Sequence, residues 1–227
     1  MSRLAWRPFR EPPELDVSTA YARWAETYPR EPANELMRLE QREVLRLLPE
    51  LAGRRLVDLG CGSGRYLAKA AALGVGPSVG LDPAPAMLAR AAGLGARLVG
   101  GALPALPFRD GSFDVAVCGL VVGHLPELAP ALAEMARVLR PGGVLVYSDL
   151  HPEGERHGWR RTFVAADARE YAVRHFVHSL EAHFEACAAA GLAVEEVAEP
   201  RVESVRRWRG APAAVVVRAG RRQAARR

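Results

Sequence analysis

The chain has 227 residues, 49% hydrophobic and 25% charged, which suits one well-buried globular domain and is too short for two. No uninterrupted apolar run approaches the roughly twenty residues of a membrane span, and Arg, Pro and Glu break up the first sixteen residues, so we expect neither a membrane segment nor a secretory leader. The net charge of +5 is scattered along the chain and concentrated only in the arginines of 221–227, so we do not expect a nucleic-acid partner.

These properties predict a cytoplasmic protein with a single domain over 1–220. Within it we expect an N-terminal helical cap over about 15–50 and an insertion over about 151–178 that covers a site. Residues 221–227 have no apolar face and are predicted to form a basic, disordered tail. The three cysteines are far apart and form no CxxC pair, which favours reduced, buried thiols.

Short apolar runs alternate with helical patterns through most of the chain, which is typical of strands joined by crossover helices in a mostly parallel sheet. The last two strands are separated by a hairpin-length connection, so one of them is expected to be antiparallel. In one predicted helix, Pro83 occupies a position suited to the first turn. Helices are predicted over 35–48, 65–73, 83–95, 129–139 and 179–191. Strands are predicted over 55–59, 78–81, 96–99, 113–121, 144–148, 193–200 and 213–220.

A glycine-rich turn, LVDLGCGSGRYL, follows the first predicted strand. Glycines between a strand and a helix let a ligand approach the main chain and leave the N–H groups of the helix N-terminus free to bind it. The glycines are at 60, 62 and 64, preceded by Asp58, and Arg65 stands where a dinucleotide fingerprint has its third glycine. The spacing D-x-G-x-G-x-G therefore disfavours a nicotinamide or flavin site.

A carboxylate, Asp82, ends the second predicted strand. In a sheet of this topology, a carboxylate at this position can accept hydrogen bonds from both hydroxyls of a ribose. The alternative is that Asp82 only caps the next helix. The glycine loop one strand earlier favours the ribose interpretation.

Three motifs in order resemble the class I S-adenosylmethionine-dependent methyltransferases: the loop over 58–64, the acidic strand end at Asp82, and LPFRDGSFD before the fourth predicted strand. The resemblance covers roughly residues 20–200. It implies a doubly wound, Rossmann-like α/β fold with a mostly parallel seven-stranded sheet, in the order 3-2-1-4-5-7-6 with strand 7 antiparallel. The N-terminal YARWAETY is similar to the lead-in of small-molecule members that act in quinone and biotin pathways.

The resemblance also implies S-adenosylmethionine as the cofactor, with S-adenosylhomocysteine as the product. The glycine loop would pass under the methionine portion, Asp58 would help to bind its ammonium group, and Asp82 would hold the ribose. The family usually has an Asp at the position of Ala102, so the backbone at Ala102 and Leu103 is expected to bind the adenine instead. The implied cofactor-binding residues are Asp58, Gly60, Cys61, Gly62, Gly64, Asp82, Pro83, Ala102, Leu103 and Tyr28.

Methyl transfer from a sulfonium is an in-line displacement, so alignment of the reactants can supply much of the rate. A base would help with a hydroxyl acceptor, and His124 follows the fourth strand at the ligand-binding edge; a surface or helix-capping role is the alternative. His151 and Asp149 are the other catalytic candidates. Residues expected to contact the acceptor come from the arginine- and aromatic-rich insertion and are Arg160, Tyr171, His175 and His178.

The leading hypothesis is therefore methyl transfer to an oxygen or carbon of a small molecule. A non-catalytic S-adenosylmethionine-binding regulatory protein and an RNA methyltransferase are the alternatives. No metal is expected, since His175 and His178 provide the only tight ligand-like spacing. The sequence leaves open whether the chain forms a homodimer.

Overall fold

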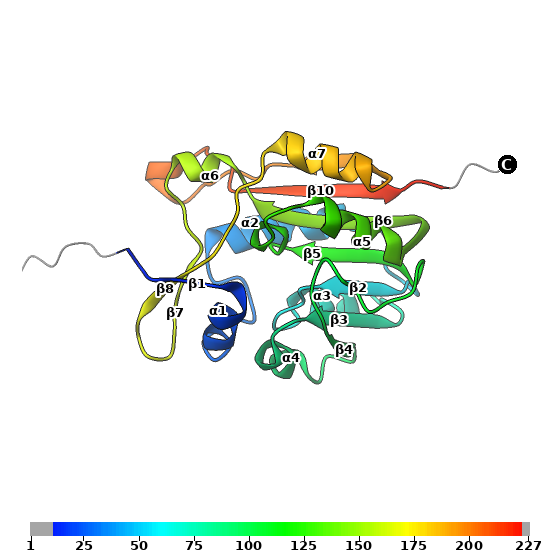
Figure 1. Cartoon of the computed structure of the whole chain (residues 1–227), viewed down its shortest axis with the longest axis horizontal. Coiled ribbons are helices and arrows are strands. Elements are labelled where there is room, and N and C mark those ends of the chain that lie inside the picture. The colour runs from blue at the N-terminus through cyan, green and yellow to red at the C-terminus, as the bar shows by residue number, and fades with distance from the viewer. Residues whose placement is uncertain (1–10, 224–227) are drawn as a thin grey trace, which may run out of the picture.

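The structure, a computed structural model, describes residues 11–223 and is built around a seven-stranded sheet (Figure 1). The order is β4-β3-β2-β5-β6-β10-β9, and β10 runs antiparallel to both of its neighbours. Numbered along the sheet's own strands, this is the predicted order 3-2-1-4-5-7-6 with strand 7 reversed, which confirms the fold class. The strands are β2 (Leu56–Leu59), β3 (Ser78–Asp82), β4 (Arg97–Gly100), β5 (Phe113–Gly119), β6 (Leu139–Leu150), β9 (Leu192–Ala198) and β10 (Ala214–Arg221).

Helices cover both faces of this sheet because the central strands are apolar on both sides; all four residues of β2 are buried. One face packs against α2 and α3 through residues such as Val44, Leu47 and Leu67. The other packs against α5 and α7 through residues such as Leu132 and Cys187. The helices are α2 (Glu35–Leu47), α3 (Arg65–Ala72), α4 (Pro85–Ala91), α5 (Ala129–Val138) and α7 (Leu180–Ala189).

A second, three-stranded sheet lies beside the main sheet and was not predicted (Figure 1). It consists of β1 (Glu14–Leu15), β8 (Glu170–Val173) and β7 (Thr162–Val164), and β1 pairs with β8 in parallel. Helix α1 (Val17–Trp24) packs against it, and together they enclose a separate apolar cluster that includes Ala20, Phe163 and Tyr171. We call this sheet, together with α1, the cap unit.

The cap unit faces the carboxyl ends of the parallel strands of the main sheet (Figure 1). This edge is where open α/β sheets bind ligands, since the loops that follow the strands all meet there. The short helix α6 (Glu153–Arg156) lies on the connection between β6 and the cap unit. No helix among residues 11–223 is long and apolar enough to cross a membrane.

Two sequence-based expectations are wrong in detail. Helix α4 begins at Pro85, which takes the first-turn position expected for Pro83. The predicted tail over 221–227 begins too early, because Arg221 ends β10 and donates hydrogen bonds from its guanidinium to the carbonyl oxygens of Arg137 and Leu139. The rest of that expected tail, residues 224–227, lies outside the described residues.

Candidate active site

The glycine loop between β2 and α3 presents its backbone to a cavity. Gly60, Gly62 and Gly64 have φ angles of 73°, 53° and 82°, the left-handed region that glycine enters without steric cost. The Gly60 and Cys61 N–H groups donate to the Leu81 carbonyl oxygen at 2.7 and 2.9 Å, which ties the loop to β3. A Cβ atom on Gly62 would meet nothing within 4 Å, so this peptide is open to a ligand.

The carboxylate of Asp82 lines the same cavity. Its Oδ2 accepts from the Gly62 N–H at 2.9 Å and its Oδ1 from the Ala84 N–H at 2.8 Å. Burial raises the pKa of this carboxyl above its ordinary value, while the bonds from Ala84 and Gly62 oppose that rise. Because each carboxylate oxygen has two lone pairs, Asp82 keeps acceptor capacity for a ligand's hydroxyl groups. Asp82 can therefore hold the glycine loop and the turn before α4 and still bind a ribose.

The cavity has a volume of about 730 Å³, in the upper part of the range for small-molecule sites. One end lies over the glycine loop, Asp82 and an apolar wall at Leu81 and Leu103. The other end lies under the cap unit. The cavity-lining residues that the sequence predicted are Tyr28, Gly60, Gly62, Asp82, Pro83, Ala102, Leu103, His124 and Arg160.

His124 forms part of a polar cluster where β5 ends. Its Nδ1 lies 3.1 Å from the Arg174 carbonyl oxygen and therefore carries the proton. Its Nε2 lies 2.7 Å from Nη1 of Arg161 and 2.9 Å from the Tyr21 hydroxyl, so its lone pair is already engaged. Burial, with Arg161 nearby, lowers the pKa of His124 to about 3. This geometry does not provide the catalytic base expected at His124.

Beneath the glycine loop, a fully buried carboxylate on α2 organises the floor of the cavity. Glu40 accepts from the Tyr66 and Ser148 hydroxyl groups, both at 2.6 Å, and from Nη2 of Arg65 at 3.1 Å. The Arg65 side chain is largely buried and lines the cavity. Glu40 thus joins α2, α3 and β6 directly below the site.

Three of the residues assigned to the cofactor do not line the cavity. Asp58 is buried behind the loop with its Oδ2 unpaired, and desolvation raises its pKa to about 7. The Cys61 side chain packs into the core below Gly80, and burial raises the pKa of its thiol. At Gly64, a Cβ atom would collide with Leu94, so this glycine serves helix packing instead of ligand approach.

The remaining catalytic and acceptor candidates do not line the cavity either. His151 bonds to Glu199 at 2.9 Å and accepts from the Glu153 N–H, at the first residue of α6, at 3.1 Å. Asp149 is buried, with its Oδ1 3.8 Å from His175 Nε2. Tyr171 donates a hydrogen bond to Asp167, and His178 bonds to the Leu125 carbonyl oxygen. The candidate histidines and tyrosine that do not line the cavity are His151, His175, His178 and Tyr171.

Sequence reasoning missed several residues that do line the cavity. Arg65 follows the glycine loop and was considered only as a departure from the dinucleotide spacing. Arg161 lines the cavity and donates a hydrogen bond to the Leu120 carbonyl oxygen, whereas the sequence predicted a contact only from its neighbour Arg160, which also lines the cavity. Two tryptophans, Trp159 and Trp208, add an aromatic wall from distant segments, with ring centroids 5.5 Å apart.

Comparison with known proteins agrees with this geometry. Residues 57–147 match the family described as a methyltransferase domain. The crystal structure of an S-adenosylmethionine-dependent methyltransferase from Mesorhizobium loti superposes with a TM-score of 0.68 at 25% identity, covering 81% of this chain and 98% of that one. Residues 57–147 form a methyltransferase domain of the S-adenosylmethionine-dependent kind. Members of this family use S-adenosylmethionine as the methyl donor.

Two curated relatives of this chain carry specific names. The phthiotriol/phenolphthiotriol dimycocerosates methyltransferase 1 of Mycobacterium ulcerans is 37% identical over 133 residues, 55% of this chain and 48% of the relative. The malonyl-[acyl-carrier protein] O-methyltransferase of Dechloromonas aromatica is 33% identical over 166 residues, 71% of this chain and 60% of the relative. The chain spans about half the length of the first of these relatives.

The two neighbouring glycines of the methyltransferase loop give opposite predictions for alanine substitution. Gly62→Ala should lower cofactor affinity more than tenfold, because its methyl group would enter the ligand space, and should cost only about 1–2 kcal/mol of stability for the left-handed φ. Gly64→Ala should lower the free energy of unfolding further, because its methyl group would strike Leu94 and Ala91. Calorimetric titration and urea denaturation measure the two effects. If Gly62→Ala and Gly64→Ala were equally stable and lost cofactor affinity equally, the assignment of Gly62 to ligand approach and of Gly64 to helix packing would be wrong.

Asp149 makes stability dependent on pH. Desolvation raises its pKa from the ordinary 3.8 to about 7, so between these pH values the folded state keeps a proton that the unfolded state has lost. Its stability contribution is fully present below pH 3.8 and is lost as the pH rises through 7. Asp149→Asn should therefore gain stability relative to the wild type between pH 5 and pH 8. Urea denaturation at several pH values checks this, and a pH-independent difference would contradict it.

Proposed function

We propose that the chain catalyses methyl transfer from S-adenosylmethionine to a small-molecule acceptor, at an oxygen or carbon atom, by in-line displacement. The observation that carries this proposal is one continuous cavity that joins the open Gly62 backbone and the Asp82 carboxylate to a space under the cap unit, which we call the second chamber. A purely regulatory cofactor-binding protein would not need the second chamber.

The residues present fit a nucleoside with an amino-acid tail. The space above Gly62 is open, and Asp82 has lone pairs left for ribose hydroxyl groups. Leu81 and Leu103 provide apolar surfaces for a base, and backbone groups at Ala102 and Leu103 would take the place of the acidic side chain usual in the family. When bound, the cofactor supplies an electrophilic methyl group on a sulfonium.

The protein's own contribution to the reaction is alignment and exclusion of water. Tyr21 and Tyr28 from the N-terminal segment line the cavity, and Tyr21 is fixed by its hydrogen bonds to His124 and Arg161. Burial raises the pKa of Tyr28 to about 12, so its hydroxyl stays protonated and can donate a hydrogen bond. These groups can hold an acceptor in position, which for a displacement reaction supplies much of the rate.

We further infer a cytoplasmic protein that does not act on nucleic acid. Its three cysteines are free and buried, which suits a reducing compartment. The sequence-based question of a homodimer stays open, and light scattering of the purified protein would answer it.

Isothermal titration calorimetry with S-adenosylmethionine and S-adenosylhomocysteine tests the cofactor assignment. We expect micromolar binding of both. Absence of binding at millimolar concentration would overturn the proposed function.

A further inference from the structure

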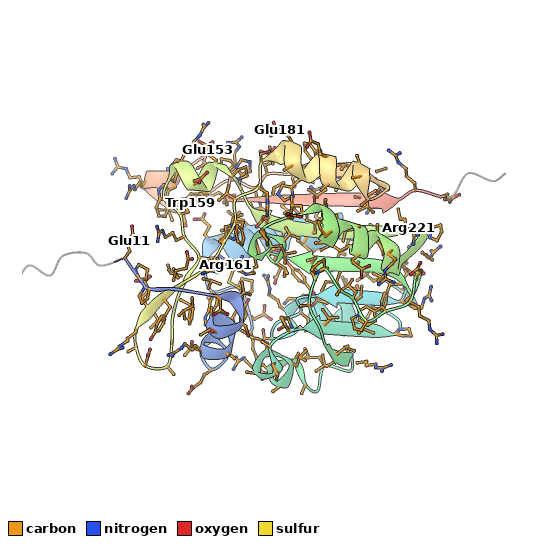
Figure 2. The ribbon with its side chains drawn as sticks, viewed as in Figure 1. Glu11, Glu153, Trp159, Arg161, Glu181 and Arg221 are labelled. Atoms are coloured by element: carbon orange, nitrogen blue, oxygen red, sulfur yellow. The ribbon has the colours of Figure 1, made fainter. Side chains whose placement is uncertain are left out.

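Arg161 is a half-buried cation in the wall of the cavity and has no carboxylate partner among the described residues. Figure 2 places it between the cap unit and the main sheet. Its hydrogen bonds among residues 11–223 all run through Nη1, to Tyr21 Oη at 2.9 Å, the Leu120 carbonyl oxygen at 2.8 Å and His124 Nε2 at 2.7 Å. All three acceptors are neutral. Arg161 lines the cavity, and its Nε and Nη2 have no hydrogen-bond partner among the described residues.

The surrounding charges leave this guanidinium uncompensated. No carboxylate of the described residues lies within 4.0 Å of it, and residues 1–10 contain no Asp or Glu. Asp149 influences Arg161 at longer range, but its Oδ2 is itself enclosed and unpaired. Withdrawing a cation from water is costly unless an anion compensates it, so the empty side of Arg161 points to an anionic ligand.

The same cluster offers no free imidazole base among the described residues. The Nε2 lone pair of His124 is engaged by Arg161, so no histidine in the cavity is available to take a proton from a hydroxyl group. An acceptor that is already ionised at neutral pH needs no such base. Carboxylic acids meet this condition, and their planar carboxylate matches the free edge of a guanidinium.

From these observations, and resting on the proposed function, we propose that Arg161 binds the carboxylate of a carboxylic-acid acceptor and presents it for methylation. A carboxylate oxygen forms the new O–C bond while the C–S bond of the sulfonium donor breaks and its electron pair goes to sulfur. The products are a methyl ester and a thioether. Charges balance without any proton transfer.

The test compares octanoate and phenylacetate with their primary amides, using protein saturated with S-adenosylhomocysteine for binding and radiolabelled S-adenosylmethionine for turnover. We expect both carboxylates to bind at least tenfold more tightly than the amides. Methyl esters release labelled methanol in base, so labelled product should be base-labile. Equal binding of acids and amides, or failure of both acids to bind, overturns the proposal.

Three variants assign the effect to Arg161. Arg161→Gln should weaken carboxylate binding at least tenfold while binding S-adenosylhomocysteine as the wild type does, and Arg161→Lys should restore part of it. Arg156→Gln, a matched control whose side chain is 79% exposed outside the cavity, should change neither. Loss of S-adenosylhomocysteine binding in Arg161→Gln would assign Arg161 to the cofactor and overturn this inference. Failure of the wild type to bind S-adenosylhomocysteine would instead refute the proposed function.

Discussion

Replacing Asp82 with alanine will lower the affinity for S-adenosylhomocysteine about 5- to 150-fold, the equivalent of losing about 1–3 kcal/mol of hydrogen bonding. Two effects act together. The ligand loses a carboxylate acceptor, and the Gly62 N–H loses the partner that holds the loop open. Calorimetric titration measures the affinity, and urea denaturation shows whether the fold is intact.

Asp110→Ala is the matched control, because this carboxylate is 76% exposed and does not line the cavity. It should leave cofactor affinity unchanged. If Asp82→Ala lowered stability but left affinity at the wild-type value, Asp82 would only anchor the loop and the start of α4.

The second large effect is on stability. Glu40→Ala should lower the free energy of unfolding by about 3–5 kcal/mol, because it leaves Arg65 as an uncompensated, largely buried cation and two buried hydroxyl groups without their acceptor. Glu40→Gln should recover part of the loss, since an amide oxygen still accepts a hydrogen bond. Urea denaturation monitored by tryptophan fluorescence measures both.

Glu43 on the same helix provides the comparison. Its ion pairs are with Arg42 and Arg46, whose side chains are 56% and 49% exposed, so Glu43→Gln should change stability by less than about 1 kcal/mol. A loss at Glu40 no larger than that at Glu43 would show that the buried network is worth no more than a surface ion pair.

The main sheet could be predicted because its signals are local. Apolar runs, helix stops and the D-x-G-x-G-x-G loop mark each strand and the cofactor end of the site, and the family resemblance supplied the strand order. The three-stranded sheet of the cap unit could not be predicted, although a helical cap and a covering insertion were expected. Its strands are two to four residues long, too short for a visible period, and β1 pairs with β8 across most of the chain.

Side-chain direction limited the prediction of the site. Asp149 and His151 follow the fifth predicted strand, but position along the chain does not specify where a side chain points, and neither residue lines the cavity. Arg160 and Arg161 are adjacent, so a sequence argument cannot choose between them. The contacts of Arg161 with Tyr21, Leu120 and His124 join three separate segments, and only the folded structure brings these together.

The parallel pairing of β1 with β8 has an evolutionary consequence. Under the proposed function, loops of the main sheet hold the donor, whereas the segments that carry β1 with α1 and β7 with β8 surround the acceptor. Exchange of these two segments as a matched pair would then change the acceptor and leave the donor site unaltered. Exchange of only one of the two segments would leave the two-residue strand β1 mismatched with β8, the strand it pairs with.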